Sequence, residues 1–491
     1  MISAIHWDVL WSNVALVITI LYGGTILFTV FMVILENRDP VKTISWGLFI
    51  ILIPVIGIIG YLIFGQNYRK VKIFSRKELV DLERISSLSR DQVHELPYQK
   101  FLENKKINDK RNIITLLLNN SKALLTLYNK INIFNNGEET FDSIIKALNK
   151  AEDHIHMEFY RWESDNIGNR IKEVLVKKAR EGVKIRIIYD DVGSWKISKK
   201  YLRELKKKGI ETYAFMPVRF PYLTSKANFR NHRKIIVVDG KIGFVGGFNI
   251  ADKYIHGDPK GSFWRDAHLR LEGESVHSLQ MIFLVDWHFV SKIIIGNQPR
   301  YFPDHRVKDQ CLVQITSSGP DSDWSSIMQA YFASISTAKE NVFISTPYFS
   351  PNASILTALK TASLSGVDVR IILPSHSDST IAYWNSISYI GEMLDAGIRV
   401  YLYEKGFNHA KLIMVDGVFS SIGSANVDYR SFDLNFEVIA LIYNETHTIN
   451  LENDFRRDLE NSHLIIPGEW KRRPLNQKIF ASLARILGPL Y

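Results

Sequence analysis

A pair of similar stretches, 177 residues apart, is the sequence feature that most constrains the fold of this chain. Residues 231–249 read NHRKIIVVDGKIGFVGGFN, and residues 408–426 read NHAKLIMVDGVFSSIGSAN. Each copy carries a His, a Lys, an Asp, a Gly-Gly or Gly-Ser pair and an Asn at matching positions. A repeat of this length indicates a duplicated structural unit, so we expect two similar domains.

Each copy has the pattern of a β-hairpin. The His and the Lys are two residues apart in a run that continues with apolar residues, so both side chains point to the same face of a strand. An Asp-Gly pair then closes the run, which is typical of a tight turn. The two pairs are Asp239-Gly240 and Asp416-Gly417. The returning strand brings Asn249 or Asn426 near the His and the Lys of its own copy.

An imidazole, an ammonium and an amide on one small face form a site for an anion. The candidate residues are His232, Lys234, Asp239, Asn249, His409, Lys411, Asp416 and Asn426. Two such faces placed opposite each other would hold one phosphate between two His and two Lys. Asp239 and Asp416 have two interpretations, because an Asp at this position either takes part in the chemistry or fixes the turn.

The chemistry of a phosphodiester explains why these residue types belong together. Lysine and amide donors offset the negative charge as it redistributes in the transition state. A neutral His attacks phosphorus and forms a phospho-histidine. The opposite His, when protonated, donates to the leaving alkoxide and later removes a proton from the incoming alcohol or water. Because the lysines supply positive charge, we expect no metal and no cofactor.

The paired H-x-K-x4-D motifs with their trailing Gly-Gly/Ser-x-Asn resemble the phospholipase D superfamily. That resemblance implies an α/β fold in which two similar domains share one active site that works through a phospho-histidine. It also implies an acidic residue after each Asn, which would fix the tautomer of a histidine through its Nδ1–H. The candidates are Asp266, 17 residues after Asn249, and Glu437, 11 residues after Asn426.

A finer resemblance is to bacterial cardiolipin synthases. It is carried by FWRD at 263–266, FLVDW at 283–287, TPYF at 346–349, GFNHAK at 406–411, SANVDYRS at 424–431 and GPL at 488–490. The resemblance covers nearly the whole chain. It implies a transferase that joins two phosphatidylglycerol molecules, forms cardiolipin and releases glycerol. The expected partners are therefore phosphatidylglycerol and cardiolipin in an anionic membrane, with His232 taken as the nucleophile by analogy.

The N-terminal residues 1–68 are expected to form a membrane hairpin. Residues 14–35 and 43–65 carry no formal charge, and each run is long enough for a helix that crosses a bilayer. Five Lys or Arg residues follow the second run within residues 69–77, whereas the loop between the runs has only Arg38 and Lys42. The positive-inside rule therefore predicts two spans in the cell membrane with the catalytic part in the cytoplasm.

The rest of the chain divides into four expected segments: a charged linker with an amphipathic helix at 69–112, a first domain at 113–300, a second at 301–470 and a tail at 471–491. Strand patterns occur at 155–160, 183–189, 342–349 and 367–373, and helical patterns at 171–180 and 353–362. Because strands and helices alternate in the same order in both halves, we expect a duplicated α/β unit.

The tail carries apolar residues at helical spacing: Leu475, Ile479, Phe480, Leu483, Leu487 and Leu490. Lys471, Arg472 and Arg473 precede this stripe. Two interpretations stay open, since such a helix either lies in an anionic membrane interface or packs on the domain through the stripe.

Composition leaves several functions open. The net charge of +10 fits anionic lipid or nucleic acid, and the single cysteine, Cys311, excludes an intramolecular disulfide. The alternatives are a phospholipase D that uses water, a phosphatidylserine synthase, a membrane-bound nuclease and a silent scaffold. The two apolar runs argue against a nuclease because they hold the site at a lipid surface, so we expect no nucleic-acid partner.

Overall fold

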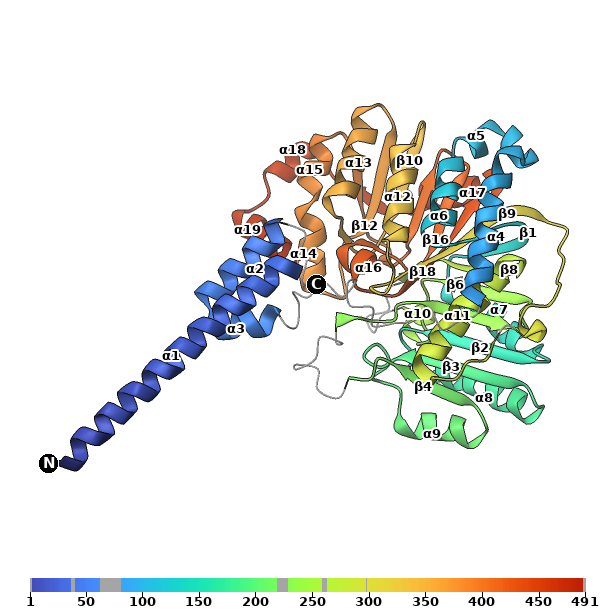
Figure 1. Ribbon diagram of the computed structural model, residues 1–491. Coiled ribbons are helices and arrows are strands. Elements are labelled where there is room, and N and C mark those ends of the chain that lie inside the picture. The colour runs from blue at the N-terminus through green and yellow to red at the C-terminus, as the bar shows by residue number, and fades with distance from the viewer. Residues whose placement is uncertain are drawn as a thin grey trace. The chain divides into compact units, whose positions relative to one another are not determined.

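The computed structural model describes residues 2–36, 40–61, 81–218, 228–257, 263–296 and 298–488. The chain separates into two compact units. One comprises residues 1–73 with 218–228, and the other comprises residues 74–217 with 229–491. The first holds the N-terminal helices, and the second holds an α/β body that contains both copies of the repeat (Figure 1).

The N-terminal unit contains one helix with the length and composition of a membrane span. Helix α1 covers Ile2–Glu36, and its segment Trp11–Leu35 is apolar with most of its large side chains exposed. At about 1.5 Å per residue, such a segment exceeds the roughly 30 Å hydrocarbon core of a bilayer. Helices α2 (Pro40–Leu52) and α3 (Pro54–Gly60) pack against it around buried Val33, Ile50 and Tyr61.

The expected continuous helix over residues 43–65 is not present. Helix α2 ends at Leu52, and α3 starts at Pro54, whose ring removes the amide that would continue the helical hydrogen bonds. Gly57 of α3 lies so close to the backbone of α2 that an added Cβ would be 2.7 Å from the Ile50 Cα. The segment is therefore two short helices, while residues 62–65 and the basic cluster at 69–77 lie outside the described residues.

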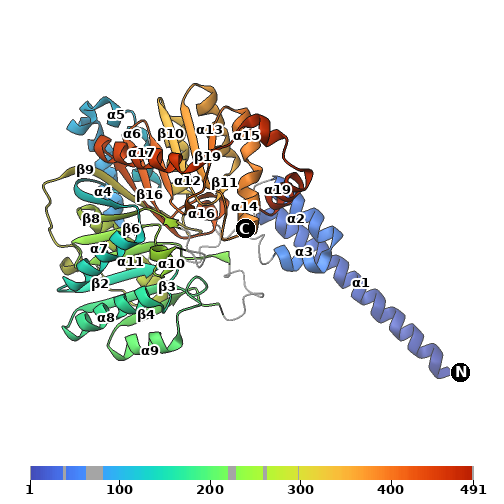
Figure 2. The same cartoon turned by 180° about the vertical axis from the view of Figure 1, so that it is seen from behind.

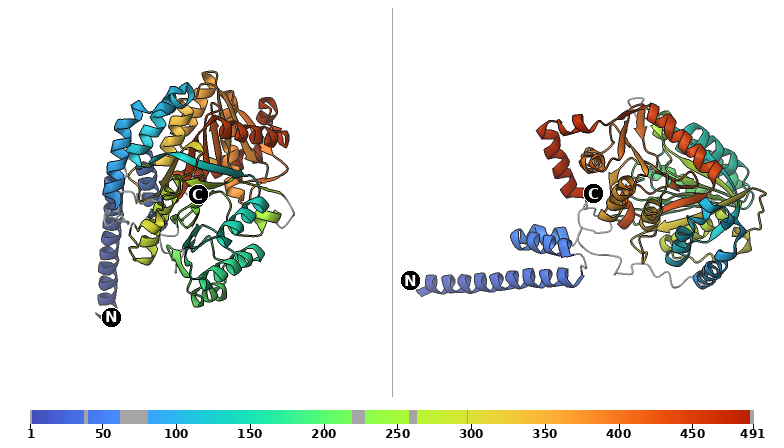
Figure 3. Two further views of the ribbon diagram at one scale, coloured as in Figure 1. Left: turned by 90° about the vertical axis from the view of Figure 1, so that its right-hand side faces the viewer. Right: turned by 90° about the horizontal axis from the view of Figure 1, so that it is seen from above.

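One fifteen-stranded sheet runs through both halves of the α/β body. From the centre outward, the first half has the order β1-β8-β6-β5-β2-β3-β4, and the second has β9-β18-β16-β15-β10-β12-β13-β19. The two orders match over seven strands, β19 is an additional edge strand of the second half, and β1 and β9 pair antiparallel where the halves join. The halves form two lobes, the first in green and the second in orange and red (Figures 1 to 3).

The strands of the first half are β1 (Leu125–Phe134), β2 (His154–Phe159), β3 (Lys184–Asp190), β4 (Glu211–Phe215), β5 (Lys234–Val238), β6 (Ile242–Gly246), β7 (Phe263–Arg265) and β8 (His268–Gly273). Those of the second half are β9 (Gln310–Ser318), β10 (Asn341–Ser345), β11 (Phe349–Ser350), β12 (Asp368–Pro374), β13 (Arg399–Tyr403), β14 (Gly406–Asn408), β15 (Leu412–Val415), β16 (Phe419–Gly423), β17 (Val427–Asp428), β18 (Glu437–Tyr443) and β19 (Ser462–Leu464).

The helices of this unit are α4 (Asp81–Glu95), α5 (Lys105–Asn108), α6 (Arg111–Asn120), α7 (Gly137–Asn149), α8 (Asn166–Arg180), α9 (Lys199–Lys207), α10 (Lys253–His256), α11 (Ser275–Ser291), α12 (Ser326–Ser336), α13 (Ala353–Leu364), α14 (Thr380–Ser388), α15 (Ile390–Asp395), α16 (Tyr429–Asp433), α17 (Glu445–Glu460), α18 (Pro467–Lys471) and α19 (Leu475–Leu487). Short 3-10 helices cover Leu96–Tyr98, Lys100–Glu103 and Pro299–Tyr301.

Most of the expected elements form with small shifts of their ends. Helix α8 starts at Asn166, five residues before its apolar pattern, because Asp165 caps it by accepting from the Gly168 amide. The strand expected over 342–349 ends at Ser345 and resumes as β11 after Pro347. Proline cannot donate to a strand ladder, which accounts for the interruption.

Three hydrophobic cores hold the α/β body together. One lies in the first half, one lies in the second, and one lies between the halves, where β6 packs against β16 and β18. Helix α6 belongs to the core of the second half, where its Ile113 and Leu117 join Ile327 of α12. The chain just after residue 113 therefore packs on the second half before it enters the first at β1.

The repeat forms the two expected hairpins, β5–β6 and β15–β16. Asp239 and Gly240 have φ of 53° and 65°, and Asp416 and Gly417 have 54° and 64°. Positive φ at both central residues is the geometry of the turn that joins two right-twisted strands. Each hairpin lies near the middle of its half-sheet, and the residues just before β5 and β15 bond to the other half through the His232 and His409 amides.

Candidate active site

Each histidine of the repeat is hydrogen-bonded to a carboxylate of the other half. His232 Nδ1 lies 3.0 Å from a carboxylate oxygen of Glu437, and His409 Nδ1 lies 2.6 Å from Asp266 Oδ2. Both carboxylates are fully buried. A carboxylate that accepts from Nδ1–H leaves Nε2 unprotonated, so each imidazole presents a nucleophilic or basic nitrogen away from its partner.

Backbone pairing between the halves places these groups. Strand β14 pairs in parallel with β7, so that Asn408 lies opposite Arg265, and the His409 amide donates to the Arg265 carbonyl at 2.7 Å. In the other direction Asn231 bridges Phe436, and the His232 amide donates to the Phe436 carbonyl at 2.9 Å. In both places the histidine and the carboxylate each follow directly after the residue that pairs with the other half.

The unequal spacing of Asp266 and Glu437 along the chain disappears in the fold, since each follows directly after the residue that pairs with the other half. The extra residues of the first half fall between α10 and β7, where 258–262 lie outside the described part. The residues beside the two carboxylates differ. The Ser424 hydroxyl donates a hydrogen bond to Glu437. At the matching Gly247, an added Cβ would lie 1.9 Å from Asp266 Oδ1, so glycine is required there.

Both lysines are buried beside their histidines. Lys234 is fully buried at the start of β5 and donates to the His232 carbonyl, and Lys411 is 2% exposed and donates to the His409 carbonyl. The charges of both lysines act on His232 and on His409, so the two motifs lie within electrostatic range of each other. The arrangement concentrates positive charge where a phosphate would bind.

Burial sets the protonation of these bases. It lowers the pKa of His232 to about 4 although Glu437 opposes the shift, and it lowers that of His409 well below its ordinary value, helped by Lys411. The pKa of Lys234 falls to about 7 and that of Lys411 to about 8, again chiefly through burial. A bound anion would favour the charged forms and reverse these shifts.

The two carboxylates respond differently to burial. Burial raises the pKa of Asp266, and the charge of Lys411 only partly offsets it. Burial also acts to raise the pKa of Glu437, but the charges of His232 and Lys234 and the hydrogen bonds from His232 and Ser424 outweigh it, so this pKa is lowered. Glu437 is therefore the more firmly ionised partner, and His232 is the histidine that it supports.

The asparagines lie beside the motifs with their amides engaged. Asn249 Oδ1 accepts from the Arg161 amide at 3.0 Å, and its Nδ2 donates to the Tyr254 hydroxyl at 3.0 Å. Asn426 Nδ2 donates to Asp428 Oδ2 at 3.1 Å. These contacts fit side chains that orient the surrounding loops.

Asp239 and Asp416 lie at the turns, at the far ends of β5 and β15 from the histidines. Asp239 accepts from the amides of Glu152, Asp153 and His154, each at 2.8 Å. Asp416 accepts from the amides of residues 339–341 and pairs with Lys110 at 2.6 Å. These contacts favour the second interpretation of Asp239 and Asp416, that each carboxylate fixes its turn.

A further pair of basic residues occupies matching positions in the two halves, just beyond the motif. Lys253 and Arg430 each lie four residues after the motif asparagine. The Lys253 ammonium lies 4.5 Å from the centre of the Trp264 ring and acts on His409. Extending the 177-residue offset past Asn249 would have identified both. Among the described residues, no group of three or more His, Cys, Asp or Glu side chains is arranged to hold a metal ion.

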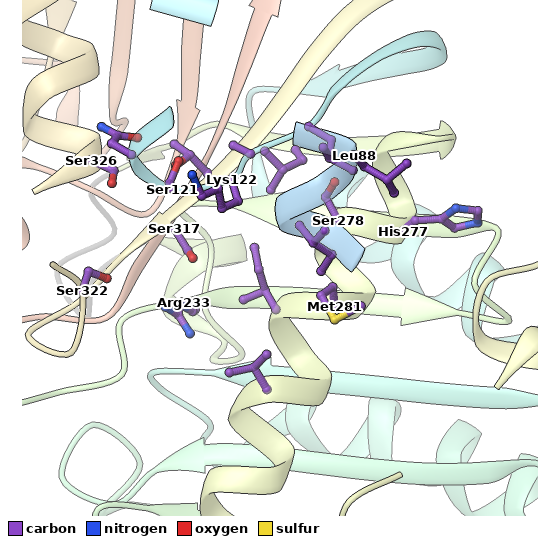
Figure 4. A pocket seen from close by; sticks show the side chains of 18 of the residues that line it. Leu88, Ser121, Lys122, Arg233, His277, Ser278, Met281, Ser317, Ser322 and Ser326 are labelled. Carbon is purple, nitrogen blue, oxygen red and sulfur yellow. The ribbon is translucent and has the colours of Figure 1, made fainter. Parts of the chain in front are cut away.

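A cavity of about 720 Å³ lies among α4, the loop before β1, α11 and β9. Arg233, between His232 and Lys234 in the sequence, contributes to its wall, and the remaining lining includes Leu88 of α4 and Met281 of α11 (Figure 4). Arg233 forms a buried ion pair with Asp286 and donates to the Glu437 carbonyl at 3.3 Å. Neither His232 nor Lys234 lines this cavity.

Comparison with known proteins places these features in a family. Residues 144–259 and 331–459 match the family described as "Cardiolipin synthase, PLD-like domain", and residues 25–66 match the phospholipase D-nuclease N-terminal family. A cardiolipin synthase of Geobacillus sp. (strain WCH70) is 42% identical over 476 residues, which cover 96% of this chain and 93% of that protein. The major cardiolipin synthase of Bacillus subtilis (strain 168) is 38% identical over 480 residues, covering 97% and 99%.

A solved structure shares the fold. The crystal structure of a phosphatidylserine synthase from Haemophilus influenzae aligns with a TM-score of 0.56 and 15% identity, covering 79% of this chain and 98% of that one. Similarity at this level of identity shows the fold and carries no statement about substrate.

The structural role of Asp239 gives a first prediction. Asp239→Asn removes one acceptor oxygen from a carboxylate that receives three amides, so the free energy of unfolding should fall by about 1–3 kcal/mol. Thermal unfolding and activity per folded molecule should be measured beside Asp304→Asn, an exposed carboxylate. Activity per folded molecule should stay within about threefold, since Asn tolerates the positive φ. A loss of activity without a loss of stability would contradict this role.

The lowered pKa values of the lysines give a second prediction. Below pH 7 both are ammonium ions, and they lose their protons as pH rises through about 7 for Lys234 and about 8 for Lys411. Affinity for the soluble diester glycerophosphoglycerol, measured by calorimetry, should therefore fall by about tenfold or more between pH 6.5 and 9. Lys234→Met should weaken binding and flatten the profile, and the exposed Lys241→Met should change neither. A flat wild-type profile would exclude cationic lysines as the anion site.

Proposed function

The chain belongs to the bacterial cardiolipin synthases of the phospholipase D superfamily, and we propose that its two His-Lys motifs carry the phosphatidyl transfer. Cardiolipin synthesis is the function that the family and the near-complete coverage of its relatives establish. The substrate that we assign is phosphatidylglycerol, used both as donor and as acceptor. The observation that supports the motif assignment is the crosswise pairing of each histidine with a carboxylate of the other half.

In the first step, Nε2 of His232 attacks the phosphorus of one phosphatidylglycerol. The bond from phosphorus to the glycerol headgroup oxygen breaks, and a phosphatidyl group is left on the histidine. His409, protonated in the substrate complex, gives its proton to the departing oxygen so that glycerol leaves as a neutral alcohol. Glu437 stabilises the positive charge that develops on His232.

In the second step, the glycerol hydroxyl of another phosphatidylglycerol attacks the same phosphorus. His409, now neutral, takes the hydroxyl proton, and the bond between phosphorus and Nε2 breaks. Cardiolipin is formed, and both histidines return to their starting states. The same steps in reverse consume cardiolipin and glycerol, so the reaction is reversible and needs no external energy source.

The lysines provide the electrostatic part of the catalysis. Lys234 and Lys411 approach the phosphate from opposite halves, and their ammonium groups offset the charge on its non-bridging oxygens. Because both are buried, this attraction acts in a medium of low dielectric constant, where it is stronger than in water. Lys253 and Arg430 extend the positive charge toward the surroundings of the site.

We assign the nucleophile to His232 because Glu437 is the better ionised of the two carboxylates. An ionised partner raises the basicity of the attached imidazole and stabilises the imidazolium that forms during attack. His409, beside Asp266, then takes the acid–base role. This assignment agrees with the one made by analogy from the sequence.

The membrane topology that we propose has two segments in the bilayer. Helix α1 crosses it, and the uncharged run 43–65 forms a second segment that is broken at Pro54. Helices α2 and α3 both pack on α1, so the break lies against a neighbouring helix, the setting in which a broken segment is tolerated in a bilayer. The basic residues of 69–77 place the catalytic body on the cytoplasmic side of the cell membrane.

Purified enzyme in phosphatidylglycerol vesicles tests the function directly. We expect cardiolipin and glycerol in equal amounts, with activity that resists EDTA because the lysines supply the positive charge. Lys411→Ala should lower the rate by about 10²-fold or more, the loss typical of removing one preorganised charge donor. Release of phosphatidic acid in place of cardiolipin, or loss of activity on chelation, would contradict the proposal.

The carboxylates give a further prediction. Glu437→Gln and Asp266→Asn should each lower kcat by about 10²- to 10⁴-fold with KM changed by less than about threefold, because an amide favours the wrong histidine tautomer. Rates should be compared with those of Glu173→Gln, an exposed carboxylate on α8, after equal folding has been verified. Unchanged kcat in either variant would show that the carboxylate does not orient its histidine.

A further inference from the structure

Helix α19 packs on the α/β body with its small residues and turns its large apolar residues outward. Ala481 and Ala484 are 4% and 7% exposed, and they lie on the face toward α14. On the opposite arc Leu475, Ile479, Leu483 and Ile486 are 72, 49, 54 and 72% exposed, whereas Phe480, 53% exposed, lies at the edge of this arc with its ring 5.9 Å from that of Trp384 on α14. Of the apolar stripe expected in the tail, Leu475, Ile479 and Leu483 are therefore largely left off the domain surface.

This inversion is unfavourable in water. A helix that covers a core normally buries its large apolar side chains, and each one left exposed forgoes about 1.5–3 kcal/mol of transfer free energy. A contiguous exposed stripe of this kind marks a surface that has a partner. Leu490 and the side chain of Leu487, which continue the stripe in the sequence, lie outside the described residues.

Positive charge borders the stripe. Lys471 and Arg472 are exposed just before the helix, and Lys478 is exposed on its first turn. Arg473 stacks on Trp470, with its guanidinium 3.3 Å from the ring centre. A cationic border on an apolar helical face fits the surface of an anionic bilayer, to which each Lys or Arg near the surface adds about 1 kcal/mol of attraction. A second copy of the helix would meet the same positive charges, which disfavours self-association through this face.

The C-terminal end of α19 lies near residues that act on the catalytic cluster, which we define as His232, Lys234, His409 and Lys411. At the end of α19, a Cβ on Gly488 would lie 3.3 Å from the Ser350 hydroxyl, and Ser350 pairs with Asp428 in the β11–β17 ladder. Asp428 lies two residues after Asn426, and its charge acts on Lys411. Helix α14, on which α19 packs, begins two residues after Asp378, whose charge acts on both His409 and Lys411.

We propose that α19 inserts its outward stripe into an anionic leaflet and holds the catalytic cluster against the bilayer surface. This inference rests on the proposed function, since it supplies the site with a lipid substrate that does not leave the membrane. It makes α19 a contact separate from α1: the N-terminal helix tethers the chain, and the C-terminal helix orients the catalytic body. Loss of the stripe should therefore impair access to vesicle lipid and leave the chemistry intact.

A fluorescent probe on α19 tests the contact itself. Cys311 is the sole cysteine and is buried, so Ile486→Cys can be labelled selectively in the full chain with an environment-sensitive dye. Leu364→Cys is the control, because Leu364 is 74% exposed at the end of α13, where the chain enters β12 on the side away from the catalytic loops.

In phosphatidylglycerol vesicles containing nitroxide lipids, the probe at residue 486 should be quenched about threefold or more strongly than the probe at 364, and phosphatidylcholine vesicles or high salt should reduce the difference. Equal quenching at both positions would overturn the proposal. Shielding of the probe at 486 that grows with protein concentration, without quenching by lipid, would also overturn it and assign the stripe to a second copy.

An activity measurement separates this inference from the proposed function. The triple variant Ile479→Gln, Leu483→Gln, Ile486→Gln should lose about tenfold in rate on phosphatidylglycerol vesicles and keep its rate on monomeric short-chain phosphatidylglycerol within about twofold. Leu364→Gln should match the wild type on both. Equal losses on both substrates, or no loss on either, would overturn the membrane role. A wild-type enzyme that makes no cardiolipin from either substrate would refute the proposed function, whereas the probe result would still stand.

Discussion

The rest of this site depends on two hydrogen bonds that cross between the halves. One joins His232 to Glu437, and the other joins His409 to Asp266. Neither half holds either His–carboxylate pair by itself, so both pairs exist only when the two halves are joined. The β7–β14 ladder and the Asn231–Phe436 bridge impose that exchange through backbone bonds, which position the catalytic groups without relying on flexible side chains.

The burial that makes this pairing strong also makes the site unfavourable when it is empty. Two ammonium groups and two imidazoles share a region shielded from water, and burial lowers the pKa of each. A phosphodiester restores the missing counter-charge, so substrate binding and protonation favour each other. The chain thus keeps a cationic site ready for an anion, with the turn carboxylates Asp239 and Asp416 and the hairpin strands fixing it from the far end.

The sequence predicted the parts of this arrangement that are local or repeated. The hairpins, the alternating strands and helices and the pairing of motifs follow from spacing, and the turn residues adopt the positive φ that Asp-Gly predicts. It did not show that each carboxylate serves the opposite half, because that depends on backbone pairing between segments more than 140 residues apart. The sequence also did not show that the helix breaks at Pro54, because an uncharged run indicates length and not continuity. Nor did it show that α19 turns its large apolar residues outward, since periodicity identifies a stripe but not what covers it.

The most direct test of the central claim is to identify the phosphorylated residue during turnover. Enzyme mixed with phosphatidylglycerol labelled in its phosphate would be quenched within the first turnover at alkaline pH, where a phospho-histidine survives, and mapped by mass spectrometry of its peptides. The account predicts label on the peptide that contains His232 and none in His232→Ala. Label on His409, or full turnover with no labelled histidine, would contradict it.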